Sequence, residues 1–288
     1  MTPHRPLIRY YGGKWHLAPW IINAMPRHRV YTEVFGGAAS VLFRKQKAPI
    51  EVLNDLDPDV AWLHRNVRHP LFHQILANTA KRMPYAPESL ESLRDREGLD
   101  IVRRGLRPVV RGAMTRSGAV DRSSGALAGF RTDAGNTSRG SAPSVEWSRW
   151  PALIPIFHTR MRRVTVLSEP AIDVLKRFDA DDAVHYLDPP YLPSARSAAR
   201  KGYAYDMLEQ DHVELLGALR GLRGAVLLSG YDSDLYRDGL PGWRRLERIS
   251  VDAGGSRRVE SLWLNPAAAD RSPATAQRGL FDAAEVAA

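Results

Sequence analysis

The sequence contains no cysteine among its 288 residues. Disulfide bridges and thiolate metal sites are therefore excluded, and so is every mechanism in which a cysteine attacks the substrate covalently. Long apolar runs are also missing, because no stretch reaches the roughly 18 residues of a membrane-spanning helix. The segment from Met1 to Tyr10 lacks the apolar core of a signal peptide. We therefore expect no membrane span and a cytoplasmic location.

Lysine is absent from one quarter of the chain, although the whole sequence carries a formal net charge of +9. Between Arg94 and Arg163 there are 14 arginines, 6 acidic residues and no lysine, an excess of +8. Charge concentrated in this way favours a polyanionic partner that binds this segment. A solvated loop that binds nothing is the competing interpretation.

The apolar pattern predicts an α/β fold with a doubly wound, mostly parallel sheet. Helices are expected from Ser40, which could cap its helix, over Ala61 to Met83, and over Glu209 to Leu222. An antiparallel pair, 244–251 with 261–264, should close the sheet. Before this pair, strands are expected at 30–35, 50–53, 164–167, 184–187 and 225–229.

Residues 84–163 interrupt this alternation. The stretch from Gly112 to Ser144 is crowded with Gly, Ser, Thr, Ala and Arg and has no clear period, which indicates a loop-rich insertion. We therefore predict a catalytic domain of residues 1–83 and 164–265 around an insertion at 84–163. Residues 266–288 are predicted to form a flexible tail.

Asp188-Pro189-Pro190-Tyr191 directly follows the strand expected at 184–187. This is the edge at which open α/β sheets bind ligands, and the two prolines stiffen the turn and leave its carbonyls free. A carboxylate and a carbonyl here could accept both N–H bonds of an exocyclic amine and localise its lone pair, while the tyrosine stacks on the base. A plain turn, in which the aspartate caps the next element, is the alternative.

Phe35-Gly36-Gly37 lies between an expected strand and helix, where small residues let a ligand approach the helix N-terminus. It matches neither the dinucleotide pattern nor a phosphate loop, so an ordinary tight connection is the alternative. Asp55 lies 19 residues beyond the first glycine, at the end of the next strand, from which an acid can accept both ribose hydroxyls. Asp57 and Asp59 are competing candidates, although Asp57 precedes a proline and is expected to begin the following helix.

Taken in order, the segments YGGK, FGGAAS, NDLD and YLDPPY resemble the N6-adenine DNA methyltransferases of the DNA adenine methylase (Dam-like) type. The resemblance runs from about Arg9 to Leu264. It implies a Rossmann-like methyltransferase fold with an inserted target-recognition region, S-adenosylmethionine as cofactor and double-stranded DNA as partner. The implied reaction is direct in-line methyl transfer to N6 of an adenine flipped out of the duplex.

The same resemblance assigns roles by position. The cofactor would contact Tyr10, Lys14, Phe35, Gly36, Gly37, Asp55 and Asp188. Of these, Asp55 would hold the ribose and Asp188 would lie where cofactor and target amine meet. The target pocket would be completed by Pro189, Pro190 and Tyr191. Two positions depart from the family pattern: Tyr10 stands where tryptophan is common, and Ala38 stands in place of a glycine and would tighten the loop.

Other functions remain open on the sequence alone. The same turn would serve N4 of cytosine or an adenine in RNA, and a non-catalytic basic DNA-binding protein could keep the scaffold. Cytosine C5 methylation normally requires a cysteine adduct and is excluded. A metal is not expected, since His64, His69 and His73 have no partner carboxylates at suitable spacing.

The C-terminal tail carries one further motif. Its segment from Gln277 to Phe281 resembles the short peptides that bind bacterial sliding clamps, through Gln277, Leu280 and Phe281. We expect this contact only if the tail is flexible enough to reach a partner.

Overall fold

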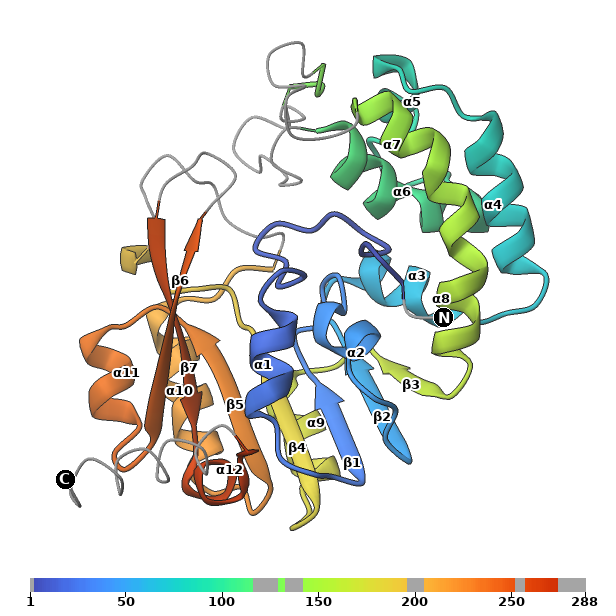
Figure 1. The fold of residues 1–288 in the computed structure, drawn as a ribbon. Coiled ribbons are helices and arrows are strands. Elements are labelled where there is room, and N and C mark those ends of the chain that lie inside the picture. Colours follow the sequence, from blue (N-terminus) through green and yellow to red (C-terminus); the bar gives the residue numbers. More distant parts are fainter. Residues whose placement is uncertain (1–2, 116–128, 133–141, 196–204, 252–256, 274–288) are drawn as a thin grey trace, which may run out of the picture.

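A computed structural model describes residues 3–115, 129–132, 142–195, 205–251 and 257–273. Its centre is a seven-stranded sheet of order β3-β2-β1-β4-β5-β7-β6 (Figure 1). β1 to β5 pair in parallel, whereas β7 pairs antiparallel with both β5 and β6. The predicted Rossmann-like α/β architecture with a mostly parallel sheet is thus confirmed. The strands are β1 (Val30–Glu33), β2 (Ile50–Asn54), β3 (Val164–Leu167), β4 (Ala183–Leu187), β5 (Ala225–Gly230), β6 (Arg244–Val251) and β7 (Arg257–Leu264).

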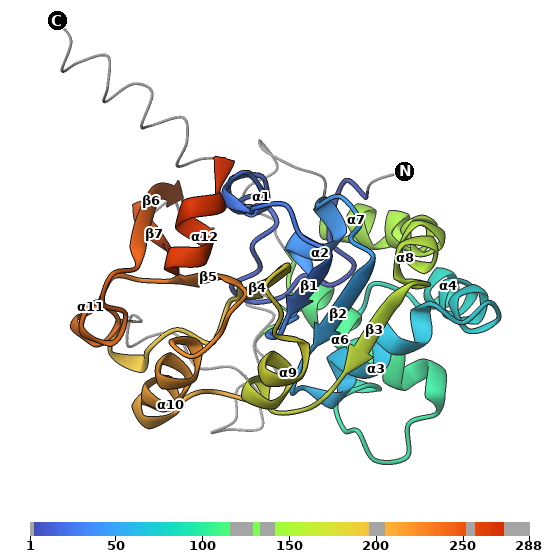
Figure 2. The same ribbon diagram turned by 90° about the horizontal axis from the view of Figure 1, so that it is seen from below.

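Helices cover both faces of the sheet, which explains why its central strands are almost completely buried. Every residue of β4 and β5 is buried, as expected for parallel strands enclosed from two sides. One face packs against α9 (Ala171–Phe178), α10 (Glu209–Leu219) and α11 (Asp234–Gly239). The other packs against α1 (Ala18–Ala24), α2 (Ser40–Arg44) and α12 (Pro266–Arg271) (Figure 2).

The strand order places a ligand crevice at the centre of the sheet. The chain runs from β1 outward through β2 to β3, then crosses back to β4 on the opposite side of β1 and continues to β5. The connections after β1 and β4 therefore diverge, and the carboxyl ends of these two strands form the switch point at which such folds bind ligands.

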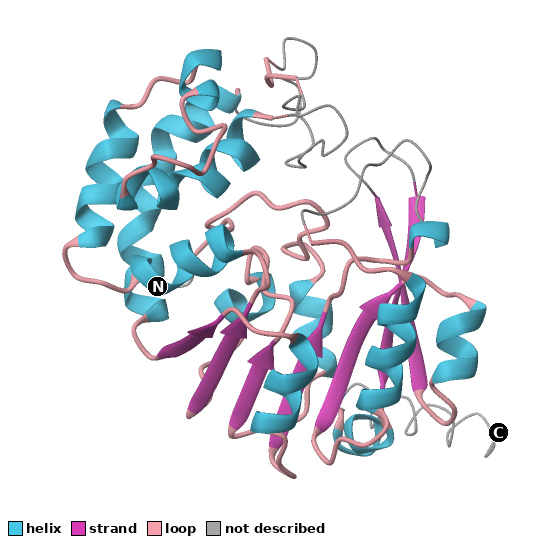
Figure 3. Ribbon diagram, turned by 180° about the vertical axis from the view of Figure 1, so that it is seen from behind, coloured by secondary structure: helices cyan, strands magenta, loops and turns pink. Residues whose placement is uncertain are grey.

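The described part of the predicted insertion is largely helical and stands beside the sheet (Figure 3). Trp147 and Trp150 anchor it, because their indole N–H groups donate to Met83 O and Leu7 O, each at 2.8 Å. Most of the stretch predicted to be loop-rich lies outside the described residues. The helices of this region are α5 (Pro87–Glu91), α6 (Ile101–Met114), α7 (Pro143–Arg149), a 3-10 turn (Trp150–Leu153) and α8 (Ile154–Met161). They pack against α3 (Pro58–Val67) and α4 (Phe72–Arg82), which precede the predicted insertion.

Two predicted elements differ from the structure. The helical pattern over Ala61 to Met83 is divided into α3 and α4, because Pro70 falls between them and cannot continue a helix. The first residues of the predicted flexible tail form α12, whose first turn is capped by the Asn265 side chain accepting from Ala268 N at 2.9 Å. Ala268 is fully buried, so packing against the sheet orders this segment.

Among the described residues, no helix combines the length and the apolar character that crossing a bilayer requires.

Candidate active site

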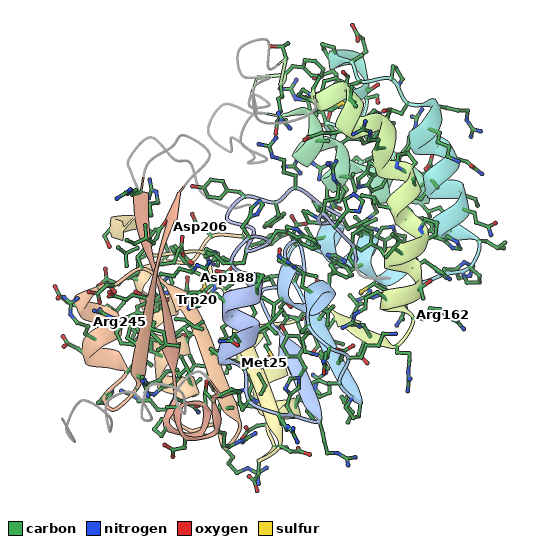
Figure 4. All side chains as sticks on the ribbon, in the orientation of Figure 1. Trp20, Met25, Arg162, Asp188, Asp206 and Arg245 are labelled. Carbon is green, nitrogen blue, oxygen red and sulfur yellow. The ribbon has the colours of Figure 1, made fainter. Side chains whose placement is uncertain are left out.

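A cavity of about 250 Å³ lies at the carboxyl ends of β1, β2 and β4. Its walls come from the segment before α1, the β1–α2 loop, the residues after β2 and the turn after β4 (Figure 4). Pro189 and Tyr191 lie behind this wall rather than on it. The predicted site residues that line the cavity are Tyr10, Lys14, Phe35, Gly36, Gly37, Asp55, Asp188 and Pro190.

Asp188 and Lys14 form an ion pair on this wall. Lys14 Nζ lies 2.9 Å from Asp188 Oδ1, donates to Gly12 O at 2.8 Å and is 4.7 Å from the centre of the Tyr191 ring. Burial raises the pKa of Asp188, and the adjacent lysine opposes that shift. Oδ1 is enclosed beside Lys14 Nζ, but the Asp188 side chain as a whole is 18% exposed and lines the cavity. The exposed part of this side chain can therefore contact a molecule in the cavity.

The tyrosine of the same turn is held by a residue on another strand of the sheet. Tyr191 donates its hydroxyl to Glu260 Oε2 on β7 at 2.9 Å. Its ring meets Tyr231 edge to face, with 4.6 Å between centres and 71° between planes. The sequence reasoning did not assign Glu260 a role, although an acidic residue just before the apolar run Ser261 to Leu264 was a usable signal.

A second acid, Glu33 at the end of β1, was also missed. It lines the cavity, is 2% exposed, and accepts hydrogen bonds from Tyr31 Oη and Leu42 N at 2.8 Å each. Burial raises the pKa of Glu33 to about 7. Its position within an otherwise apolar strand pattern was the available signal.

The glycine loop after β1 is held through both the backbone N–H and the carbonyl of Gly37. Gly37 N donates to Asp55 Oδ2 at 2.5 Å, and Gly37 O lies 2.9 Å from His64 Nε2. Burial lowers the pKa of His64 to about 4, so the ring is neutral and must carry its proton on Nε2 to donate to a carbonyl. The cofactor loop is thus fixed by α3 and by the residue that follows β2.

Asp55, at the end of β2, lines the cavity, and so does Asp57. Asp55 Oδ1 accepts from Asp57 N at 2.8 Å, and burial raises the pKa of Asp55 to about 7. Asp57 caps α3, as expected, by accepting from Asp59 N at 2.9 Å. The side chain of Asp59 contacts arginines from the insertion instead of lining the cavity.

One non-glycine residue of the loop, Ala39, has a left-handed backbone, at φ 52. Ala38, the residue that was expected to stand in place of a family glycine, does not. Ser40 does not cap α2, because Ala39 occupies the cap position and Ser40 Oγ has no hydrogen-bond partner in the described chain. A left-handed alanine costs about 1 kcal/mol.

The three histidines examined for metal binding serve separate local contacts. His69 Nδ1 accepts from Leu71 N and Phe72 N, at 3.2 and 3.3 Å. His73 stacks on His158 with 3.9 Å between ring centres, while His64 faces the glycine loop. These side chains do not converge on one point.

Comparison with known proteins shows which family part of this chain is similar to. Residues 10–119 match the model of the D12 class N6 adenine-specific DNA methyltransferases. A DNA adenine methylase from Salmonella typhi is 24% identical over 277 residues, which cover 91% of this chain and 95% of that protein. DNA adenine methylases from Salmonella typhimurium, including strain LT2, match with the same identity and coverage.

Proposed function

We propose that this chain is a D12 class N6 adenine-specific DNA methyltransferase, which takes a methyl group from S-adenosylmethionine and transfers it directly to an adenine flipped out of duplex DNA. The observation that carries the proposal is the Asp188 side chain, which is paired with Lys14 and 18% exposed on the cavity wall at the carboxyl end of β4. Adenine as the target base is also what the family match supports over N4 of cytosine.

The charge of the cavity fits the cofactor. Seven acidic residues and one lysine line it, and such a wall favours a cation and disfavours phosphate. The bound cofactor would supply a methyl group on a sulfonium, which is cationic. The acidic residues on the wall are Glu33, Asp55, Asp57, Glu169, Asp188, Asp206 and Asp211.

Individual side chains also fit the adenosine part. Asp55 accepts one backbone N–H on each carboxylate oxygen, which leaves each oxygen a lone pair for a ribose hydroxyl. Tyr10 packs on the glycine loop so closely that a Cβ at Gly37 would lie 3.0 Å from its ring. Ser40 adds a buried hydroxyl on the cavity wall without a partner among the described residues.

At the target amine, the residues of the turn act by position. The Asp188 carboxylate accepts one amine N–H, and a carbonyl of the proline pair accepts the second, so that the nitrogen lone pair points at the methyl group. Lys14 stays paired with Asp188 and favours its ionised form. Pro189 stiffens the turn and Tyr191 supports it from behind, held by Glu260.

The test is methylation of a duplex oligonucleotide by Asp188→Ala, followed by mapping of the modified base. We expect turnover to fall by about 10² to 10³ or more, with DNA affinity retained. Asp181→Ala is the matched control, because Asp181 has an 86% exposed side chain before β4, at the opposite end of that strand. Retained turnover in Asp188→Ala, or methyl groups on cytosine, would contradict the proposal.

The sliding-clamp contact remains a proposal for the tail, since Gln277, Leu280 and Phe281 lie outside the described residues. Deleting residues 277–288 should abolish co-purification with the clamp while methylation of short duplexes continues. Unchanged co-purification would end the idea.

A further inference from the structure

The β6–β7 hairpin projects past the end of the sheet on the side of the cavity. β5 pairs with β7 only through Ser261 to Leu264. Pairing between β6 and β7 continues beyond this point, from Arg248 opposite Glu260 to Val251 opposite Arg257. Figure 1 shows the hairpin rising on one side of the N-terminal segment, with the helical insertion on the other.

The two faces of this projection differ. Residues directly opposite in an antiparallel pair share a face, and faces alternate along each strand. Arg248, Ser250, Arg258 and Glu260 therefore share one face, which we call the site face. Glu260 bonds to Tyr191, and Arg258 Nη1 lies 3.5 Å from Tyr231 Oη, so the site face looks onto the catalytic turn.

The opposite face carries Ile249, Arg257 and Val259. Ile249 and Val259 form a direct cross-strand pair and are 64% and 48% exposed, so the described residues leave this face uncovered. The same hairpin therefore offers two arginines toward the site and one away from it. This contrast lets the two faces be compared by experiment.

The acidic charge of the cavity restricts where the DNA phosphates can lie relative to the site face. A flipped adenine would enter the cavity, but its flanking phosphates would be repelled by a wall of seven acids and one lysine. They must lie on the rim. The site face supplies cations there, because Arg258 lies over Tyr231, with 5.9 Å to the ring centre, and Tyr231 contacts Tyr191 of the turn.

We propose that Arg248 and Arg258 bind phosphates next to the target nucleotide, so that the hairpin forms a DNA-contact surface facing the arginine-rich insertion. This inference rests on the proposed function, because it takes the adenine to be bound at Asp188. The partner is the sugar-phosphate backbone of duplex DNA, recognised by charge and not by sequence.

The experiment measures duplex affinity of the full chain by fluorescence anisotropy between 50 and 200 mM salt. Each lost phosphate contact makes the plot of log affinity against log salt less steep by about 0.9. When the salt rises from 50 to 200 mM, the fall in affinity should therefore be about 3.5-fold smaller in R248A and in R258A than in the wild type. R258K keeps the charge and should restore the slope. R257A, the same change on the opposite face, should keep the wild-type slope.

Wild-type slopes in R248A and R258A would overturn the inference, and so would an equal drop in R257A. S-adenosylmethionine binding, measured by calorimetry on the same proteins, separates this outcome from failure of the proposed function. That function fails if the wild type neither binds the cofactor nor modifies adenine, whatever the salt slopes are.

Discussion

The cavity and helix α6 carry opposite charge, and the boundary between them is only a few residues wide. The cavity wall holds seven acids and one lysine. α6 holds four arginines and no acid, and two of these, with Arg96, gather around Asp59. Asp55 faces the cavity and Asp59 faces the arginines, although only three residues separate them in the sequence.

This contrast shows how one segment serves two kinds of ligand. Asp55 is bonded to backbone N–H groups and desolvated, which suits an acceptor for a neutral or cationic small molecule. Asp59 is 1% exposed and neutralises only part of the positive charge around it. The remaining arginine charge is available to a polyanion, in agreement with the proposed action on DNA.

We expect the largest effect from replacing Asp59, the acid that the arginines surround. Asp59→Asn leaves three arginines without their shared carboxylate. We expect the free energy of unfolding to fall by about 3 to 4 kcal/mol, because breaking a buried ion cluster strands its charges. Urea unfolding measures this, with exposed Asp238→Asn on α11 as control, expected within about 0.5 kcal/mol. Equal losses in both variants would contradict the cluster's importance.

On the acidic side, Glu33→Gln tests the cost of a buried carboxylate. The folded protein binds this proton more tightly than the unfolded chain, with a pKa of about 7 against 4.5. The wild-type contribution is thus fully present below about pH 4.5 and is lost as pH rises to about 7, by up to about 3 kcal/mol. The variant should gain stability over the wild type across this window. The free energy of unfolding of both proteins is measured in urea at pH 4.5, 6 and 7.5. The same difference between variant and wild type at all three pH values would contradict the prediction.

The boundary residue itself is tested by Asp55→Asn. An amide can accept from only one side, so either Gly37 N or Asp57 N loses its acceptor, and the ribose loses a charged partner. We expect S-adenosylmethionine to bind about 30-fold more weakly, or about 2 kcal/mol. Calorimetry measures the dissociation constant, and Asp181→Asn at the far end of β4 should leave it unchanged. Unaltered affinity in Asp55→Asn would remove this residue from the cofactor site.

The smallest effect concerns the loop that separates the two regions. Ala39→Gly relieves a left-handed backbone at a cost in unfolded-state entropy, for a net gain of about 0.5 kcal/mol. Ala38→Gly, one residue earlier and without positive φ, should lose about as much. Thermal unfolding of the two variants compares them directly. The same sign for both would mean that strain at Ala39 is not significant.

Strands were the best-predicted elements. β3 and β6 have the predicted bounds, because each is a β-branched or alternating run between turn residues. The helical insertion was harder to predict, since its arginine-rich helix α6 is stabilised by packing on α3 and by contacts with Asp59. Apolar periodicity reports which face is buried, but it does not report a polar partner from another element.

The site divides in the same way. Asp188 and Asp55 were found because each directly follows a buried strand. Glu260 and His64 were not assigned roles, because their partners, Tyr191 and Gly37, lie 69 and 27 residues away in the sequence. The left-handed backbone of Ala39 was not predicted, since Ala38 and Ala39 are both alanine and only the backbone dihedral distinguishes them.

The sequence by itself determined the order of strands and turns, the rigid proline turn after β4 and the concentration of arginine in one segment, since these depend on local sterics and composition. Only the tertiary structure decided which acids share the cavity, which acid the arginines hold, and that the β6–β7 hairpin faces the turn after β4. Those outcomes depend on desolvation and on distances between charges from distant parts of the chain, and both arise only when the sheet and the insertion pack together.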